Sequence, residues 1–76
     1  MAAKGSWEDR AKRFLKAELK RADVSYAELA ERLKGHGLAE TEASIANKLS
    51  RGTFAATFFL ATLTALECQA VTLSDL

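Results

Sequence analysis

Residues 52–66 form an uncharged stretch of 15 residues, rich in Ala, Thr, Phe and Leu, and this stretch constrains the fold most. It is too short to cross a bilayer, which takes about 20 apolar residues. We predict a helix from Phe54 to about Glu67, with Thr53 as its N-cap. Because a helix that is apolar all round must be buried all round, and few neighbours are available, we expect part of it to contact a second subunit. The side chains expected at that dimer interface are Phe54, Phe58 and Leu60.

The chain length favours one domain over residues 1–76, with residues 1–5 and 74–76 expected to be flexible. A chain of this size buries only about 60–65% of the surface that it exposes when unfolded. Cys68 is the single cysteine, so no disulfide can form within the chain. A lone thiol and the lack of a signal-peptide pattern at the start favour a reducing compartment, and we expect a cytoplasmic protein.

Three further helices are predicted from N-cap residues and apolar spacing. Ser6 and Ser25 each precede an acidic residue at the third helical position, which is typical of a capping box. The third helix is expected over residues 41–51, with Gly52 as its stop, and Gly35 is the expected C′ residue of the second. The first helix places a stripe on one face: Trp7, Ala11, Phe14, Leu15, Leu19 and Ala22.

The sequence therefore predicts an all-α, compact four-helix domain of helix-turn-helix type. Residues 69–73 alternate between polar and apolar side chains, which permits a short β-strand. One strand alone is unstable in water, so it would pack as irregular tail or pair with its copy across a dimer. We favour the pairing, through Val71 and Leu73.

Charge is distributed unevenly along the chain, although the formal total is only +1. Residues 4–21 carry seven positive and three negative charges, residues 22–42 are acidic, and residues 43–52 carry two positive charges. Every Lys and Arg lies in the first 52 residues. The basic face of the first helix is either a solvated surface or a contact surface for phosphate, through Lys12, Arg13, Lys16 and Lys20.

The predicted third helix carries two distinct stripes. Ile45 and Leu49 face a core, and a second stripe repeats at i, i+3, i+4 and i+7. Hydroxyl, amide, ammonium and guanidinium groups together suit the reading of base edges and phosphates. We expect Ser44, Asn47 and Lys48 to contact bases, and Ser50 and Arg51 to lie near the DNA backbone.

Residues 25–33 and 44–52 resemble two segments of lambda-repressor/Cro-like regulators: the capped first helix of the helix-turn-helix, and the end of the recognition helix, which closes on Arg-Gly. Phe59, Leu63 and Leu66 are similar to the leucine ladder of that family's next helix. The connection through residues 35–40 is longer than in that family, and Glu40 and Glu42 add acidic groups at the start of the recognition helix. The chain as a whole more closely resembles a small bacterial family catalogued as a domain of unknown function, and residues 41–54 carry that likeness.

Two functions are open. The first is a homodimeric, DNA-binding transcriptional regulator that reads the major groove of double-stranded DNA with helix 41–51. The alternative is a protein-interaction domain, antitoxin-like or an adaptor, that docks a partner through helix 54–66. An enzyme is not expected, because His36 and Cys68 lie on different elements and no catalytic or nucleotide-binding motif is present. We expect no cofactor, metal, membrane contact or small-molecule substrate.

Overall fold

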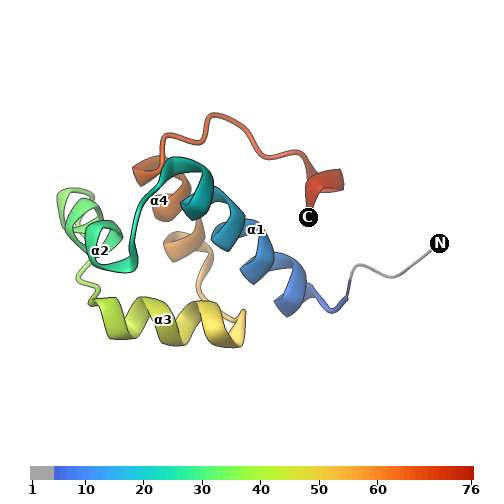
Figure 1. The fold of residues 1–76 in the computed structure, drawn as a ribbon, viewed down its shortest axis with the longest axis horizontal. Helices are drawn as coiled ribbons and strands as arrows, with labels where there is room; N and C mark the ends of the chain where they lie inside the picture. The colour runs from blue at the N-terminus through green and yellow to red at the C-terminus, as the bar shows by residue number, and fades with distance from the viewer. Residues whose placement is uncertain (1–4) are drawn as a thin grey trace.

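The computed structural model describes residues 5–76, which form four α-helices and one short 3₁₀ turn. The elements are α1 (Trp7–Ala22), α2 (Tyr26–Gly35), α3 (Glu42–Arg51), α4 (Ala56–Ala65) and η1 (Leu73–Asp75). In Figure 1, α3 lies along one side of the molecule and the C-terminal segment crosses the opposite side, with α1 between them. Helix α3 packs against α1 and α2, and α2 also packs against α4. The all-α prediction is confirmed.

The first three helices begin where the capping residues predict. The side chains of Ser6 and Ser25 accept hydrogen bonds from the backbone N–H groups of Asp9 and Glu28, each at 3.1 Å. Each bond satisfies one of the N–H groups that a first helical turn leaves without a partner. Helix α3 ends with Gly52 as its C-cap, at φ +73°, as expected.

The end of α2 differs from the prediction. Gly35 is the last helical residue, and His36 is the C-cap with φ −102°. The left-handed conformation falls on Gly37, with φ +85°, so this glycine turns the chain away from α2.

Helix α4 begins two residues later than predicted. Its N-cap is Ala55, which provides no side-chain hydrogen bond, and the first helical residue is Ala56. Thr53 does not cap the helix; its hydroxyl oxygen instead lies 3.4 Å from Nε of Arg51, which donates to it. Residues 53–55 thus form a linker that lets α4 turn away from the end of α3.

One hydrophobic core holds the four helices together. Phe58 lies inside it with 2% exposure, so within the single chain it is a core residue and not part of an exposed face, as a contact with a second subunit would require. Its ring packs against Phe54 with 5.4 Å between centroids, and the Lys48 ammonium lies 5.5 Å from its centre. Phe54 is half-buried against the core, whereas Leu60 on α4 is 61% exposed. The side chains buried most completely are these: Leu15, Leu29, Leu33, Ile45, Leu49 and Thr62.

The apolar stripe predicted on α1 is only partly buried. Leu15 and Leu19 are buried and Phe14 is half-buried, but Trp7 is 66% exposed and Ala22 is also exposed. The indole of Trp7 lies under the guanidinium of Arg10, whose central carbon is 3.9 Å from the ring centroid. This cation–π contact occupies one face of an indole that the core does not enclose.

In the single chain, residues 69–73 form no strand and run as irregular tail, which is one of the two expected forms; pairing with a second copy stays a prediction. Val71 packs against the core, Leu73 is 76% exposed, and η1 forms by a bond from the N–H of Asp75 to the carbonyl of Thr72. Residues 74–76, expected to be flexible, are placed against α1, where the carbonyl oxygen of Leu76 accepts a hydrogen bond from Arg10 Nε at 3.2 Å. Residues 1–4, the greater part of the other flexible end, lie outside the described residues.

None of the helices described over residues 5–76 combines the length and the apolar character that crossing a membrane requires.

Candidate nucleic-acid interface

The exposed side of α3 carries part of the predicted stripe. Asn47, Ser50 and Arg51 are exposed together near the C-terminal end of the helix, and Ala43 and Ala46 share the exposed surface. Ile45 and Leu49 on the other side of α3 are 0% and 1% exposed. The core therefore fixes which side of α3 faces solvent.

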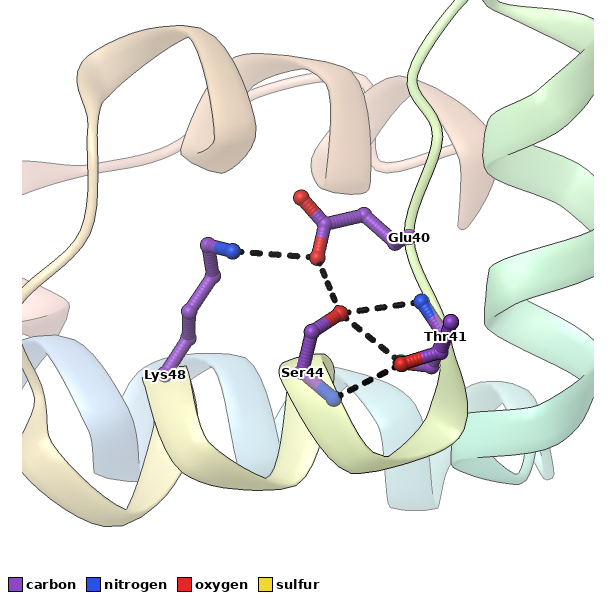
Figure 2. Close-up of polar contacts among 4 residues, drawn as sticks. All are labelled: Glu40, Thr41, Ser44 and Lys48. Carbon is purple, nitrogen blue, oxygen red and sulfur yellow. Dashed lines mark hydrogen bonds and ion pairs between the residues drawn. The ribbon is translucent and has the colours of Figure 1, made fainter.

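The other two residues of the predicted stripe, Ser44 and Lys48, are held by the carboxylate of Glu40 (Figure 2). The Ser44 hydroxyl lies 2.6 Å from Glu40 Oε1, and Lys48 Nζ lies 3.1 Å from the same oxygen. Ser44 also completes a capping box with Thr41: its hydroxyl accepts from the Thr41 N–H at 2.9 Å, while the Thr41 hydroxyl accepts from the Ser44 N–H at 3.0 Å. The side chains of Ser44 and Lys48 are half-buried, and their polar groups are bonded within the chain, so they are not presented to a ligand.

The Glu40–Ser44–Lys48 cluster explains what the long connection before α3 does. Leu38 packs against the core, and Glu40 then reaches over the first turn of α3 with only 11% of its side chain exposed. Lys48 lies 3.1 Å from this carboxylate and neutralises its charge. Glu42, in the first turn of α3, remains exposed.

Of the four basic residues predicted on α1, Lys12 lies directly beside α3. Its ammonium lies 3.4 Å from the Ser50 carbonyl oxygen, to which it donates, and 3.4 Å from Asp9. Lys16 and Lys20 are exposed and follow Lys12 at intervals of four residues, so they continue along α1 at a gradually rotating angle.

Arg13 lies on a different side of α1. Its Nε donates to the Asp9 carbonyl at 3.3 Å, and its side chain borders a cavity under the C-terminal segment. The structure therefore brings Asn47, Ser50, Arg51 and Lys12 together, with Lys16 adjoining them, and separates Arg13 from this group.

The first turn of α1 is fixed against the last turn of α3 by a close backbone approach. A Cβ on Gly52 would overlap the carbonyl oxygen of Glu8. This contact sets the position of the basic α1 surface relative to Arg51, which immediately precedes Gly52.

The sequence did not indicate the Glu40–Lys48 pair. The two residues are eight positions apart and Glu40 precedes the helix, so the rule that pairs residues three or four apart on a helix does not apply to them. The only local signal was the spacing of Glu40, Ser44 and Lys48 at i, i+4 and i+8.

A protein-family model matches residues 7–71, so the chain belongs to the family described as a domain of unknown function, DUF6471. The match covers α1 to α4, including both the exposed side of α3 and the basic residues of α1. No curated protein and no solved structure matches the chain significantly. The prediction of a family catalogued as a domain of unknown function is confirmed.

Proposed function

We propose that this domain binds double-stranded DNA by placing the exposed side of α3 in the major groove, and that it acts as a homodimeric transcriptional regulator. The observation that carries the proposal is the exposed group of Asn47, Ser50 and Arg51 on a helix whose other side is anchored by Ile45 and Leu49. A major groove about 12 Å wide admits one α-helix. Anchoring α3 on one side leaves its polar side available for that groove.

Asn47 is the main candidate for reading a base. An Asn side chain can form two hydrogen bonds to adenine through N6 and N7. The exposed Ala43 and Ala46 add no bulk beside it, so they allow a close approach and can contact a thymine methyl group. Ser44 and Lys48, which the sequence also suggested, would have to leave Glu40 before they could contact DNA.

Phosphate contacts come from a different set of side chains. Arg51 is exposed at the end of α3 and Lys16 is exposed on α1, whereas Lys12 would first have to leave Asp9 and the Ser50 carbonyl. With four or five phosphate contacts in a dimer, the logarithm of the binding constant should fall with the logarithm of salt concentration at a slope of about −4.

Fluorescence anisotropy with labelled genomic fragments and random duplexes tests the proposal, using Asn47→Ala and Arg51→Gln. Losing one good base contact costs about 1–3 kcal/mol and relaxes sequence preference. Arg51→Gln removes two phosphate contacts from a homodimer, so it should weaken binding to all duplexes and reduce the salt slope by about 2.

Lys34→Gln is the matched control, because Lys34 lies on α2, has a 63% exposed side chain and pairs only with exposed Glu31. It removes the same charge as Arg51→Gln, but from α2 and not from α3. Absence of binding at micromolar protein, binding insensitive to salt, or an equal loss in Lys34→Gln and Arg51→Gln would each refute the proposed interface.

A second candidate function is supported by the exposed Leu60 on α4. This helix has no charged residue, and Leu60 is one of three large apolar side chains exposed in the described chain. A contiguous exposed apolar patch serves association, and the uncharged α4 would contribute Leu60 to such a patch. If the exposed face of α4 forms a dimer, it supports the DNA proposal. If this face binds another protein, the domain is an antitoxin-like or adaptor module.

A further inference from the structure

A cavity of about 370 Å³ lies between α1 and the C-terminal segment, on residues that the DNA-binding proposal does not use. Three arginines from α1, Arg10, Arg13 and Arg21, contribute to one wall. Phe14 and Ala17 lie between them in the sequence and supply apolar surface. The opposite wall comes from the C-terminal segment: Cys68, Ala70, Asp75 and Leu76.

The two ends of this cavity differ electrostatically. At the Arg21 end, the guanidinium pairs with Glu18 at 3.1 Å, and the Glu18 side chain is only 9% exposed. At the Arg10 end, the cavity wall contains Arg10 and Arg13, and the wall's remaining carboxylate belongs to exposed Asp75. At the Arg10 end, Arg10 also donates to the main-chain oxygen of Leu76, the last residue of the sequence.

Arg10 is held in place before any ligand arrives. Its central carbon lies 3.9 Å from the Trp7 ring centroid, and its Nε donates to the Leu76 carbonyl at 3.2 Å. A guanidinium has five N–H donors and a planar fork that matches a carboxylate. Because stacking and the Nε bond already fix this plane, an incoming anion loses less binding energy to the ordering of the side chain.

The apolar part of the cavity is also held in place. Phe14 packs against Phe59 with 6.2 Å between ring centroids, and Cys68 donates to the Ala70 carbonyl at 3.4 Å. Small-molecule sites characteristically combine such apolar walls with a few fixed polar groups, in volumes of roughly 300–1,000 Å³.

We propose that this cavity binds a small organic carboxylate, with the carboxylate on Arg10 and the apolar body against Phe14 and Ala17. An inorganic anion would use the guanidinium but not the apolar wall. A neutral molecule of the same shape would use the wall but not the guanidinium. The two requirements together define the ligand class, and they do not depend on DNA binding.

Titration with benzoate at constant ionic strength tests the proposal, with fluorescence of Trp7 as the readout. Trp7 is the only tryptophan in the chain and stacks on Arg10, so its emission reports events at that guanidinium. We expect a saturable change with a dissociation constant in the range of about 1 mM. Benzamide, the neutral analogue, and inorganic phosphate should bind at least about tenfold more weakly.

Variants measured by isothermal titration calorimetry locate the site. Arg10→Gln removes the guanidinium, and Ala17→Leu fills the apolar part while it leaves every charge in place; each should weaken benzoate binding about tenfold or more. Lys20→Gln, an exposed α1 residue outside the cavity lining, should bind benzoate as the unaltered chain does. Circular dichroism confirms that each variant keeps its helices.

Three results would overturn the proposal. The first is no saturable signal with benzoate up to about 10 mM, which is too weak for a specific site. The second is equal affinity for benzoate and either benzamide or phosphate. The third is unchanged benzoate binding in folded Ala17→Leu, which would place any binding outside this cavity.

Discussion

At the scale of single residues, glycines with different surroundings give a direct test of how α3 is fixed to α1. Gly52 combines φ +73° with a Cβ position that overlaps the Glu8 backbone. Gly37 has φ +85°, but nothing lies within 4 Å of its Cβ position. The left-handed conformation costs a residue with a Cβ about 1–2 kcal/mol, so Gly37→Ala should lose only that amount.

Gly52→Ala adds a backbone clash to this conformational strain, and we expect it to lose at least about 3 kcal/mol of unfolding free energy in urea titrations. Gly35→Ala, a helical position with open space around it, should be neutral or should stabilise by up to about 1 kcal/mol. Equal losses in Gly37→Ala and Gly52→Ala would show that Glu8 does not constrain the end of α3.

Thr62 is a second residue whose environment predicts a measurable effect. It is 0% exposed, and its hydroxyl oxygen has no hydrogen-bond partner among residues 5–76. A buried polar group without a partner costs about 1–3 kcal/mol, whereas Val has almost the same shape without the hydroxyl. Thr62→Val should therefore raise the midpoint of urea unfolding by an amount equivalent to about 1 kcal/mol.

The control for Thr62 is Thr64, in the same helix. Its exposed hydroxyl donates to the Leu60 carbonyl at 2.9 Å. Thr64→Val should change the unfolding free energy by less than about 0.5 kcal/mol. A loss of stability in Thr62→Val would mean that the hydroxyl has a partner, such as a buried water.

At the scale of helices, the sequence predicted most features that depend on local chemistry, although Thr53 does not cap α4 and Gly35 lies within α2. Ser6 and Ser25 cap α1 and α2, and Gly52 ends α3, because a cap needs only a side chain and a backbone a few residues apart. The side of α4 that faces the core could not be predicted. A helix with apolar residues on every side has no periodic signal, so nothing local distinguished buried Phe58 from exposed Leu60.

In the candidate site, too, the sequence predicted only what local spacing determines. Asn47 and Arg51 were expected at the surface of α3, and the structure leaves both exposed. Ser44 and Lys48 share the polar stripe in sequence, but the connection before α3 folds back and delivers the Glu40 carboxylate to both. That contact depends on the path of residues 35–40, which no helical periodicity encodes.

The link between Glu40 and Lys48 should contribute to the stability of α3. The side chains are 11% and 27% exposed, so solvent screens the pair less than it screens a surface pair. A double-mutant cycle with Glu40→Gln and Lys48→Met should give a coupling free energy of about 1–2 kcal/mol in urea unfolding. Lys34 and Glu31, 63% and 73% exposed, form the control pair and should couple by less than about 0.5 kcal/mol. Similar coupling in the two cycles would mean that the burial of Glu40 has no energetic effect.

At the scale of the whole molecule, charge and apolar surface are separated, and this separation bears on assembly. The basic residues of α1 and the polar side of α3 adjoin each other, as the bond from Lys12 to Ser50 shows. Helix α4 carries no charged residue at all. A dimer formed through α4 would therefore bring together no like charges from this helix, and it would leave α3 of each copy available for DNA.

Leu60 is the residue that decides whether α4 forms that dimer, since it is 61% exposed whereas Phe58 lies in the core. We expect sedimentation velocity to show a dimer at tens of micromolar and a monomer for Leu60→Glu, with unchanged helical content by circular dichroism. Trp7→Gln removes a side chain of similar exposure, 66%, from the start of α1 and should leave the dimer intact.

For a two-fold dimer, binding to two half-sites about 34 Å apart should weaken when Leu60→Glu separates the subunits. A monomer at all concentrations that still binds DNA would remove dimerisation from the proposed function, while a dimer that survives Leu60→Glu would place the interface outside α4.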